Sequence, residues 1–492
     1  MGLEIEQETF DEADYSLFRE RLEDSVGALH KALAVPGFGQ SETSVGAELE
    51  MFLMTADGRP AALNERVRRT VSDRRIALEV DQFNLEANLT PVELRGRPFT
   101  AMRAETDTLL EAVGRAAGSH GARPVLIGTL PTLVPSDLRR SALTPRGRFH
   151  HIENALARRR GTPYLLVFDG DEPCTLMADS IAVQGATSSW QLHLVVTPAE
   201  FTRAYNAAQL ATGPVLAAAG NSPLLLGRRL WHETRIPMYE QGFGDRAAAA
   251  AGPVRASFGS HWLDGGVVRL FEDAVRDHEV LLPVLSAREP AHHRTSGAPW
   301  LEELRLHQGT VWTWNRPVYD PDGHVRIEFR ALPSGPTSID MAANSAFLLG
   351  LTLYLSRQPN DIRTTMAFET ARENFYRAAR SGLEARLCWP SADQTGLAWS
   401  SAAELIPRLL PLAAEGLISA GVDAGEAEEL LWVVAGRVST GQTGSVWQLR
   451  ALQALEERAD RRTALCRLTD AYTQVSASHE PVHTWGIPAR RG

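Results

Sequence analysis

Acidic, amide and imidazole side chains recur at alternate positions in short apolar stretches of this sequence. In VGAELEMFL (45–53), Glu48 and Glu50 alternate with apolar residues, and in SSWQLHLVV (188–196) Gln191 and His193 do the same. Side chains two positions apart on a strand share a face and lie roughly 6.6 Å apart. Carboxylates and imidazoles are ligands that divalent metals accept. The pattern therefore predicts a metal site on one face of a sheet.

Two further stretches divide in the same way. QFNLEAN (82–88) places Glu86 opposite its apolar residues, and HVRIEFR (324–330) places Glu328 and Arg330 opposite Val325, Ile327 and Phe329. An antiparallel sheet with one face in water alternates by default, so each strand alone is also consistent with a solvated face. Four glutamate-rich faces together favour a carboxylate-lined trough, because clustered carboxylates repel unless a cation neutralises them. We predict Mg²⁺ or Mn²⁺ ligands at Glu48, Glu50, Glu86, His193 and Glu328.

The elements that carry these residues follow from periodicity and turn signals. Helical patterns cover 8–35, 99–121 and 199–220, and the chain is almost wholly helical from 340 onward. We expect strands at 45–54, 76–89, 162–168 and 181–197, a hairpin over 310–331, and a loop-rich region at 221–300. This order predicts an α+β fold: a curved, largely antiparallel sheet whose carboxylate-lined concave face is backed by helices. We expect an N-terminal helical segment (1–40), a catalytic core (41–355) and a helical C-terminal region (356–492) packed on the core.

The composition limits the partners of the chain. Its 492 residues are 44% hydrophobic and 22% charged, and the net charge of −10 argues against a nucleic-acid binder. Three scattered cysteines suit a reducing compartment, and the acidic N-terminus does not have the pattern of a signal peptide. The longest apolar run (346–355) is too short to span a bilayer, so we expect a cytoplasmic protein with no membrane partner. Homo-oligomers remain possible.

Lysine chemistry is almost absent from this chain. Lys31 is the only lysine, and there is no Walker A motif or kinase-type strand lysine. Any handling of phosphate must therefore rest on arginines and metal ions.

Several motifs in order along the chain resemble one enzyme family. They are GAELE (46–50), NLEANLTPVE (84–93), GTLP (128–131), GNSPLLLGRRLWHETR (220–235), RIEFR (326–330) and TGSVWQLRA (443–451). The chain resembles the carboxylate-amine/thiol ligases of the glutamate–cysteine ligase type 2 family, over about residues 41 to 455. The resemblance implies a glutamine synthetase/guanido kinase-like catalytic fold. It also implies ATP-dependent amide formation, usually on the side-chain carboxylate of glutamate, through an acyl phosphate.

The resemblance also implies roles for individual residues. Arg235 and Arg330 would stabilise the moving phosphoryl group beside Glu328, and Gln191 and Arg148 would join them in binding ATP with Mg²⁺. Arg148 lies in an arginine-rich stretch that a solvated basic helix face would also explain. His307 and Arg316 either contact substrate or lie on a surface hairpin.

The expected substrates are small molecules: glutamate or a related amino acid, and an amine or a thiol-bearing amino acid. Two other functions remain open at this point. The same glutamate and histidine trough would suit a metal-dependent hydrolase, and a non-catalytic relative would bind nucleotide or amino acid without turnover. Nothing in the sequence specifies the acceptor amine.

Overall fold

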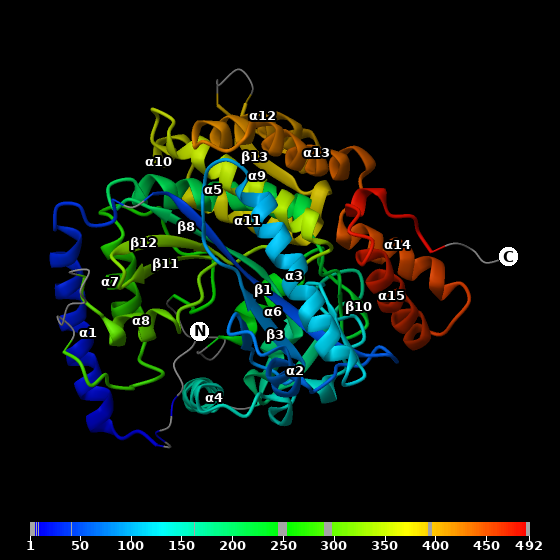
Figure 1. Cartoon of the computed structure of the whole chain (residues 1–492), viewed down its shortest axis with the longest axis horizontal. Helices are drawn as coiled ribbons and strands as arrows, with labels where there is room; N and C mark the ends of the chain where they lie inside the picture. Colours follow the sequence, from blue (N-terminus) through cyan, green and yellow to red (C-terminus); the bar gives the residue numbers. More distant parts are fainter. Residues whose placement is uncertain are drawn as a thin grey trace.

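The computed structural model describes residues 5, 7, 9–40, 42–161, 163–244, 253–289, 298–391 and 396–488. Its centre is an antiparallel sheet in the order β11-β12-β8-β1-β3-β2, and β4 and β5 also pair with β1 (Figure 1). The strands are β1 (Ser44–Thr55), β2 (Ile76–Leu78), β3 (Asn84–Asn88), β4 (Val92–Glu93), β5 (Ala122–Val125), β8 (Trp190–Val196), β11 (Asn315–Asp320) and β12 (His324–Phe329). The predicted antiparallel sheet is therefore confirmed.

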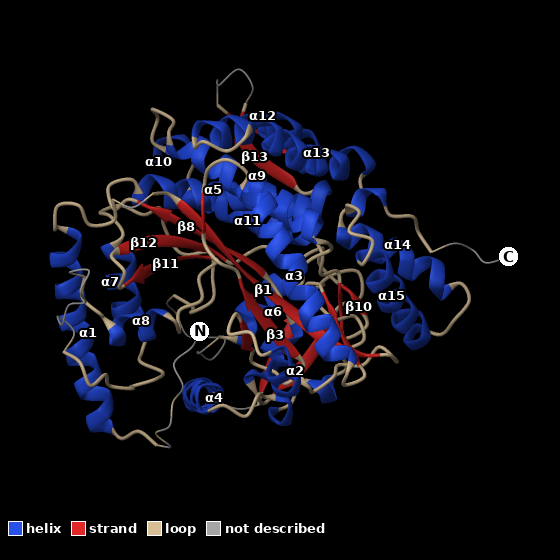
Figure 2. Ribbon diagram, viewed as in Figure 1, coloured by secondary structure: helices blue, strands red, loops and turns tan. Residues whose placement is uncertain are grey.

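Helices cover the apolar face of this sheet (Figure 2). Val45, Ala47 and Leu49 of β1 are buried in one large core with α3 (Pro98–Gly118), α5 (Phe201–Ala219) and α9 (Ser338–Ser356). A second layer packs on α5 and α9; it consists of α11 (Phe368–Ser381), α12 (Ala402–Ser419) and α13 (Ala424–Thr440). The apolar side chains on alternate positions of β1 and β8 thus direct the other face of the sheet away from the core.

The register of the sheet places the predicted polar residues next to one another. Glu48 is the cross-strand partner of Gln191, and Glu50 is the partner of Glu86. His193 is the partner of Glu328, which is itself the partner of Arg316. Because cross-strand partners point to the same face, all of these side chains share the uncovered face of the sheet.

Helix α9 is long and apolar enough to cross a membrane, but 89% of its most apolar window is buried inside the protein. Its Ser345 hydroxyl accepts a hydrogen bond from the Trp190 indole of β8 at 2.8 Å. Both observations identify α9 as a core helix that supports the sheet.

The remaining elements lie around this core. The other helices are α1 (Glu12–Leu33), α2 (Asn64–Val71), α4 (Gly147–Arg160), α6 (Arg235–Gly242), α7 (Val268–Asp277), α8 (Glu302–Gln308), α10 (Ile362–Thr365), α14 (Gly444–Glu456) and α15 (Arg461–Ser476). Three two-stranded hairpins complete the fold: β6 (Tyr164–Phe168) with β7 (Cys174–Ala178), β9 (Leu224–Leu225) with β10 (Arg228–Arg229), and β13 (Arg386–Pro390) with β14 (Leu397–Ser401).

One local expectation was wrong. Residues 181–186 form a 3₁₀ helix, not a strand, and the side chain of Ser180 caps its first turn. Short apolar runs do not distinguish a strand from a helical turn, which explains this error. The expected strand at 162–168 is present as β6, which pairs with β7 outside the central sheet. The described part of the loop-rich region 221–300 also contains the short helices α6 and α7.

Candidate active site

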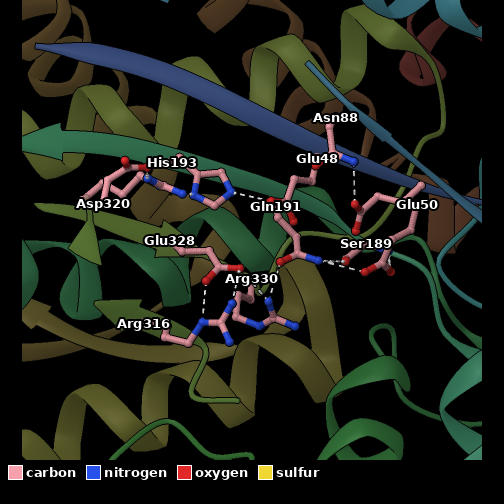
Figure 3. A network of polar contacts seen from close by, with 12 residues as sticks. Glu48, Glu50, Asn88, Ser189, Gln191, His193, Arg316, Asp320, Glu328 and Arg330 are labelled. Atoms are coloured by element: carbon pink, nitrogen blue, oxygen red, sulfur yellow. Dashed lines mark hydrogen bonds and ion pairs between the residues drawn. The ribbon is translucent and has the colours of Figure 1, made fainter. Parts of the chain in front are cut away.

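Three of the predicted metal ligands converge at the centre of the uncovered face. Glu48, His193 and Glu328 come from the neighbouring strands β1, β8 and β12, and each offers a ligand atom within 4.8 Å of the others. His193 Nε2 lies 3.1 Å from Glu48 Oε1, as Figure 3 shows. One imidazole and two carboxylates at this spacing form a donor set suited to a divalent cation.

Glu328 carries the strongest local interactions in the site. Arg316 donates to both of its oxygens, at 2.5 and 3.0 Å, and Arg330 Nη1 donates at 2.7 Å. Burial alone would raise the pKa of Glu328, but Arg316 and Arg330 more than offset this and hold its pKa far below the usual range. Glu328 is therefore a fixed negative charge that two arginines share.

Glu50 and Glu86 form a second acidic group one row along the sheet. Burial raises the pKa of both carboxyls, and the neighbouring glutamates raise that of Glu86 further. The backbone N–H of Ser189 and the amide of Gln191 donate to Glu50 at 2.7 and 2.8 Å. Asn88 donates to Glu86 at 2.6 Å. These donors orient the carboxylates toward a shared space.

Glu79 belongs to this second group, although it was not among the predicted site residues. Burial and the nearby Glu50 raise its pKa to about 7, and Glu86 also interacts with it. A usable signal was present, because in IALEV (76–80) Ile76 and Leu78 alternate with Ala77 and Glu79. The stretch is short, so a single glutamate there was easily overlooked.

A cavity of about 1010 Å³ is lined by the glutamates of both acidic groups, whereas His193 is not among its lining residues. Its basic lining includes Arg148, Arg316 and Arg330, and its apolar wall includes Phe243 and Trp312. These two rings stack with their centroids 3.8 Å apart. The volume is ample for a nucleotide-sized or drug-sized ligand.

Gln191 and Arg330 connect the two acidic groups. Arg330 Nη1 donates to Gln191 Oε1 at 2.5 Å, and Arg330 Nη2 donates to the Tyr239 hydroxyl at 2.7 Å. Gln191 in turn donates to Glu50. Both residues line the cavity, as their predicted roles require.

Arg235 is not among the residues that line this cavity, so its predicted contact with phosphate stays a prediction. It is 2% exposed, and its guanidinium donates to the backbone oxygens of Ala331 and Arg330 at 2.9 and 3.2 Å. An ion pair of 3.2 Å joins it to the buried Glu233. In this arrangement Arg235 supports the chain that carries Arg330. The family resemblance placed Arg235 near the site but gave no direction for its side chain.

Arg148, Arg316 and His307 have different surroundings. Arg148 at the start of α4 lines the cavity, and burial together with the nearby Arg316 lowers its pKa. Arg316 also faces the cavity, so it does not lie on a surface hairpin. His307 is 2% exposed and contacts the carbonyl oxygen of Ala274, and burial lowers its pKa to about 4. His307 therefore has a structural position in α8.

Known proteins with a similar fold include glutamate–cysteine ligase from Francisella tularensis, solved with AMP. The identity is 10%, the alignment covers 91% of this chain and 90% of that chain, and the TM-score is 0.53. A bifunctional glutathione synthetase from Pasteurella multocida aligns over 94% of this chain and 55% of that chain, with 12% identity and a TM-score of 0.45. The similarity in fold therefore rests on the first of these.

Sequence comparison gives a complementary result. No curated protein matches the chain significantly along its sequence. The profile of glutamate-cysteine ligase family 2, in contrast, matches residues 44–464, which include every strand of the central sheet and both acidic groups. The chain therefore belongs to glutamate-cysteine ligase family 2.

Proposed function

We propose that this protein is an ATP-dependent carboxylate-amine/thiol ligase that forms an amide bond, in the first instance a γ-glutamyl bond, through an acyl phosphate. One observation carries the proposal. Glu48, His193 and Glu328 offer ligand atoms within 4.8 Å of one another, and the two glutamates line a large cavity beside the guanidinium groups of Arg316 and Arg330. Phosphoryl transfer to a carboxylate needs this combination of cation ligands and arginines.

The residues of the trough fit divalent cations. Burial raises the pKa of Glu50, Glu79 and Glu86, and neighbouring carboxylates raise those of Glu79 and Glu86 further, so a bound cation would stabilise the charged forms of this group. The buried Oδ1 of Asn84, which also lines the cavity, has no hydrogen-bond partner among the described residues. We assign Glu48, His193 and Glu328 to one ion and Glu50, Glu79 and Glu86 to another. Bound Mg²⁺ or Mn²⁺ would screen the charge between ATP and the attacking carboxylate.

The arginines would bind the transferring phosphoryl group, while the acidic residues hold the cations. Arg330 is held by Gln191, Glu328 and Tyr239, so its guanidinium is already oriented when substrate enters. Such preorganised charge stabilises a transferring phosphoryl group without reorganisation during the reaction. Arg316 and Arg148 add positive charge on the same side of the cavity.

Water must be kept from an acyl phosphate, because hydrolysis would waste the activated acid. The stacked rings of Phe243 and Trp312 supply an apolar wall to the cavity that holds the acids. Apolar walls lower the local water content and strengthen electrostatic interactions inside a site. This wall also favours ligation over simple hydrolysis, which requires water at the same place.

The test is a turnover assay with ATP, Mg²⁺, glutamate and a panel of amines and thiol-bearing amino acids. A ligase releases ADP and phosphate only when a competent amine is present, and mass spectrometry identifies the amide product.

Glu328→Gln should lower turnover by about a hundredfold or more, as loss of an electrostatic catalytic group does. Glu111→Gln, at an exposed glutamate of α3 outside the cavity lining, is the matched control. Hydrolysis of an added ester or amide without ATP would contradict the proposal and favour a hydrolase. Binding of ATP without turnover against any acceptor would favour a non-catalytic protein.

A further inference from the structure

A second cavity, of about 570 Å³, lies apart from the acidic trough. The two cavities have no lining residue in common. The walls of the second cavity come from the turn after β1, the segment 131–137, the β9–β10 hairpin, and the adjoining ends of α14 and α15, which lie beside β10 in Figure 1. Its volume is typical of sites that bind small molecules.

Apolar side chains form one side of this cavity. Leu133 is 1% exposed and Leu465 is 7% exposed, and Leu226 packs against the same hydrophobic cluster. Leu226 has a φ of +51° and precedes Gly227 with a φ of +70°. A left-handed conformation is costly for leucine, by roughly 1 kcal/mol or more, and such strain tends to occur where function requires it. The hairpin therefore holds a leucine at the edge of the cavity where glycine or asparagine would be less strained.

The charged groups on the other side of the cavity form two sets. In one set the charges cancel through ion pairs, and in the other they are positive and have no ion-pair partner among the described residues. Arg229 and Arg461 each form ion pairs with Glu172 and Glu456, so these four groups neutralise one another. The lining residue Asp137 accepts a hydrogen bond from the backbone N–H of Val134 at 3.0 Å.

The positive set consists of three arginines on the rim. Arg59, Arg228 and Arg462 are exposed, and no carboxylate of the described residues lies within ion-pair distance of them. Asp57 lies near Arg59 and Arg462, and the Thr55 hydroxyl is the main cause of its lowered pKa. Three arginines from three separate segments thus give this cavity an excess of positive charge beside an apolar floor.

We propose that this cavity is a separate binding site for a small organic anion with an apolar body. The leucines would pack on the body of the ligand, and the arginines of the rim would bind its carboxylate, sulfonate or phosphate group. The acids and the imidazole of the trough contribute nothing to this site, so its ligand is an effector or auxiliary ligand and not a reactant. This inference goes beyond the proposed ligase function and does not depend on it.

Cys466 provides a natural reporter, because its thiol lines this cavity whereas Cys174 does not. Burial raises the pKa of Cys466, so alkylation by iodoacetamide is measured at about pH 9, nearer its titration range. The full-length protein, without ATP or Mg²⁺, is alkylated with and without naphthalene-1-sulfonate, and mass spectrometry measures each thiol separately. We expect naphthalene-1-sulfonate to slow alkylation of Cys466 about tenfold at saturation and to leave Cys174 unchanged.

Two simpler probes separate the parts of the proposal. Sodium sulfate has the charge without the apolar body, and 1-naphthalenemethanol, which stays neutral at about pH 9, has the body without the charge. Each should need at least about tenfold higher concentration than naphthalene-1-sulfonate, since each lacks one of the two contributions. Equal protection by sulfate would overturn the apolar contribution, and equal protection by 1-naphthalenemethanol would overturn the role of the arginines.

Charge reversal tests the arginines directly. The variant Arg228→Glu/Arg462→Glu should lose protection of Cys466 by the sulfonate, whereas Arg467→Glu, on the exposed side of the same helix α15, should keep it. Unchanged melting temperatures show that the variants fold. No protection in the wild-type protein, or undiminished protection in the double variant, overturns the proposal whatever the ligase assay shows.

Discussion

Arg316 interacts directly with one of the proposed cation ligands in the acidic trough. It donates to both oxygens of Glu328, a proposed cation ligand, so it competes with a cation for the same carboxylate. We expect Arg316→Gln to bind Mg²⁺ about 3- to 10-fold more tightly, because a repelling charge is removed, and to lose kcat/KM for ATP, because an anion-binding charge is lost. Isothermal titration with Mg²⁺ and initial-rate kinetics measure the two effects. Arg305→Gln, which lines the cavity but has no contact with Glu328, is the control. Unchanged Mg²⁺ affinity in Arg316→Gln would contradict the competition.

Asp81 is a second informative residue, because neither of its buried oxygens has a hydrogen-bond partner among the described residues. Burial, Glu153 and Glu79 raise its pKa in the folded protein. The folded state therefore binds this proton more tightly, and its contribution to stability is present at low pH and is lost as the pH rises. Asp81→Asn should raise the free energy of unfolding by about 1–3 kcal/mol at about pH 8, and by less at about pH 5. Denaturant unfolding at both pH values measures this, with the exposed Asp179→Asn as control. An equal gain at both pH values would show that charge is not the cause.

At the scale of elements, the sequence predicted side-chain direction most accurately in strands where buried apolar residues alternate with polar ones. Glu48 and Glu50 stand between buried apolar residues of β1, so their common face followed from period two alone. Arg235 shows the limit: it begins α6 after a loop, and only the packed fold directs its guanidinium to the carbonyl oxygens of Arg330 and Ala331. Glu79 shows another limit, because its strand β2 has only three residues and the site residue lies just beyond it. Strand pairing and side-chain direction cannot be predicted from a short stretch of sequence where they depend on segments that are distant in the chain.

The helices behind the sheet approach most closely where α9 crosses α12. A Cβ on Gly416 of α12 would fall inside the van der Waals radius of the Gly350 carbonyl oxygen of α9. We expect Gly416→Ala to lower the free energy of unfolding by about 1–3 kcal/mol through overpacking, although alanine is the better helix former. Gly114→Ala in α3, where a Cβ meets nothing within 4 Å, should instead stabilise by up to about 1 kcal/mol. Chemical denaturation of both variants tests this, and stabilisation by both would show that the helix crossing can widen at little cost.

At the scale of the whole molecule, the acidic trough lowers stability, and the apolar core on the other face of the sheet offsets that cost. Glu50, Glu79 and Glu86 come from strands β1 and β3 and from the end of β2. Burial raises the pKa of each, and repulsion by neighbouring carboxylates adds to this for Glu79 and Glu86. The same sheet is stabilised on its other face by a continuous apolar core with the helices. This division allows a repulsive acidic surface to persist in a folded protein, because the core offsets its cost.

The balance between core and trough predicts how stability responds to pH and to divalent cations. Because the pKa values of Glu79 and Glu86 are raised in the folded state, to about 7 for Glu79, these two carboxyls bind more protons in the folded protein than in the unfolded chain above about pH 4.5. In EDTA the melting temperature should therefore fall as the pH rises from about 6 to 8. Mg²⁺ that binds only the folded state adds about 2.7 kcal/mol at a hundred times its dissociation constant, which should raise the melting temperature by a few degrees and flatten its pH dependence.

Differential scanning fluorimetry of the wild-type protein and of Glu50→Gln/Glu86→Gln separates the effect of carboxylate repulsion from that of Mg²⁺ binding. The double variant should melt higher than the wild type in EDTA at pH 8 and gain less from Mg²⁺ than the wild type does, since the ligands of one of the two proposed ions are lost. If instead it gains as much from Mg²⁺ as the wild type, the cation binds elsewhere, and the assignment of this second acidic group to an ion is wrong.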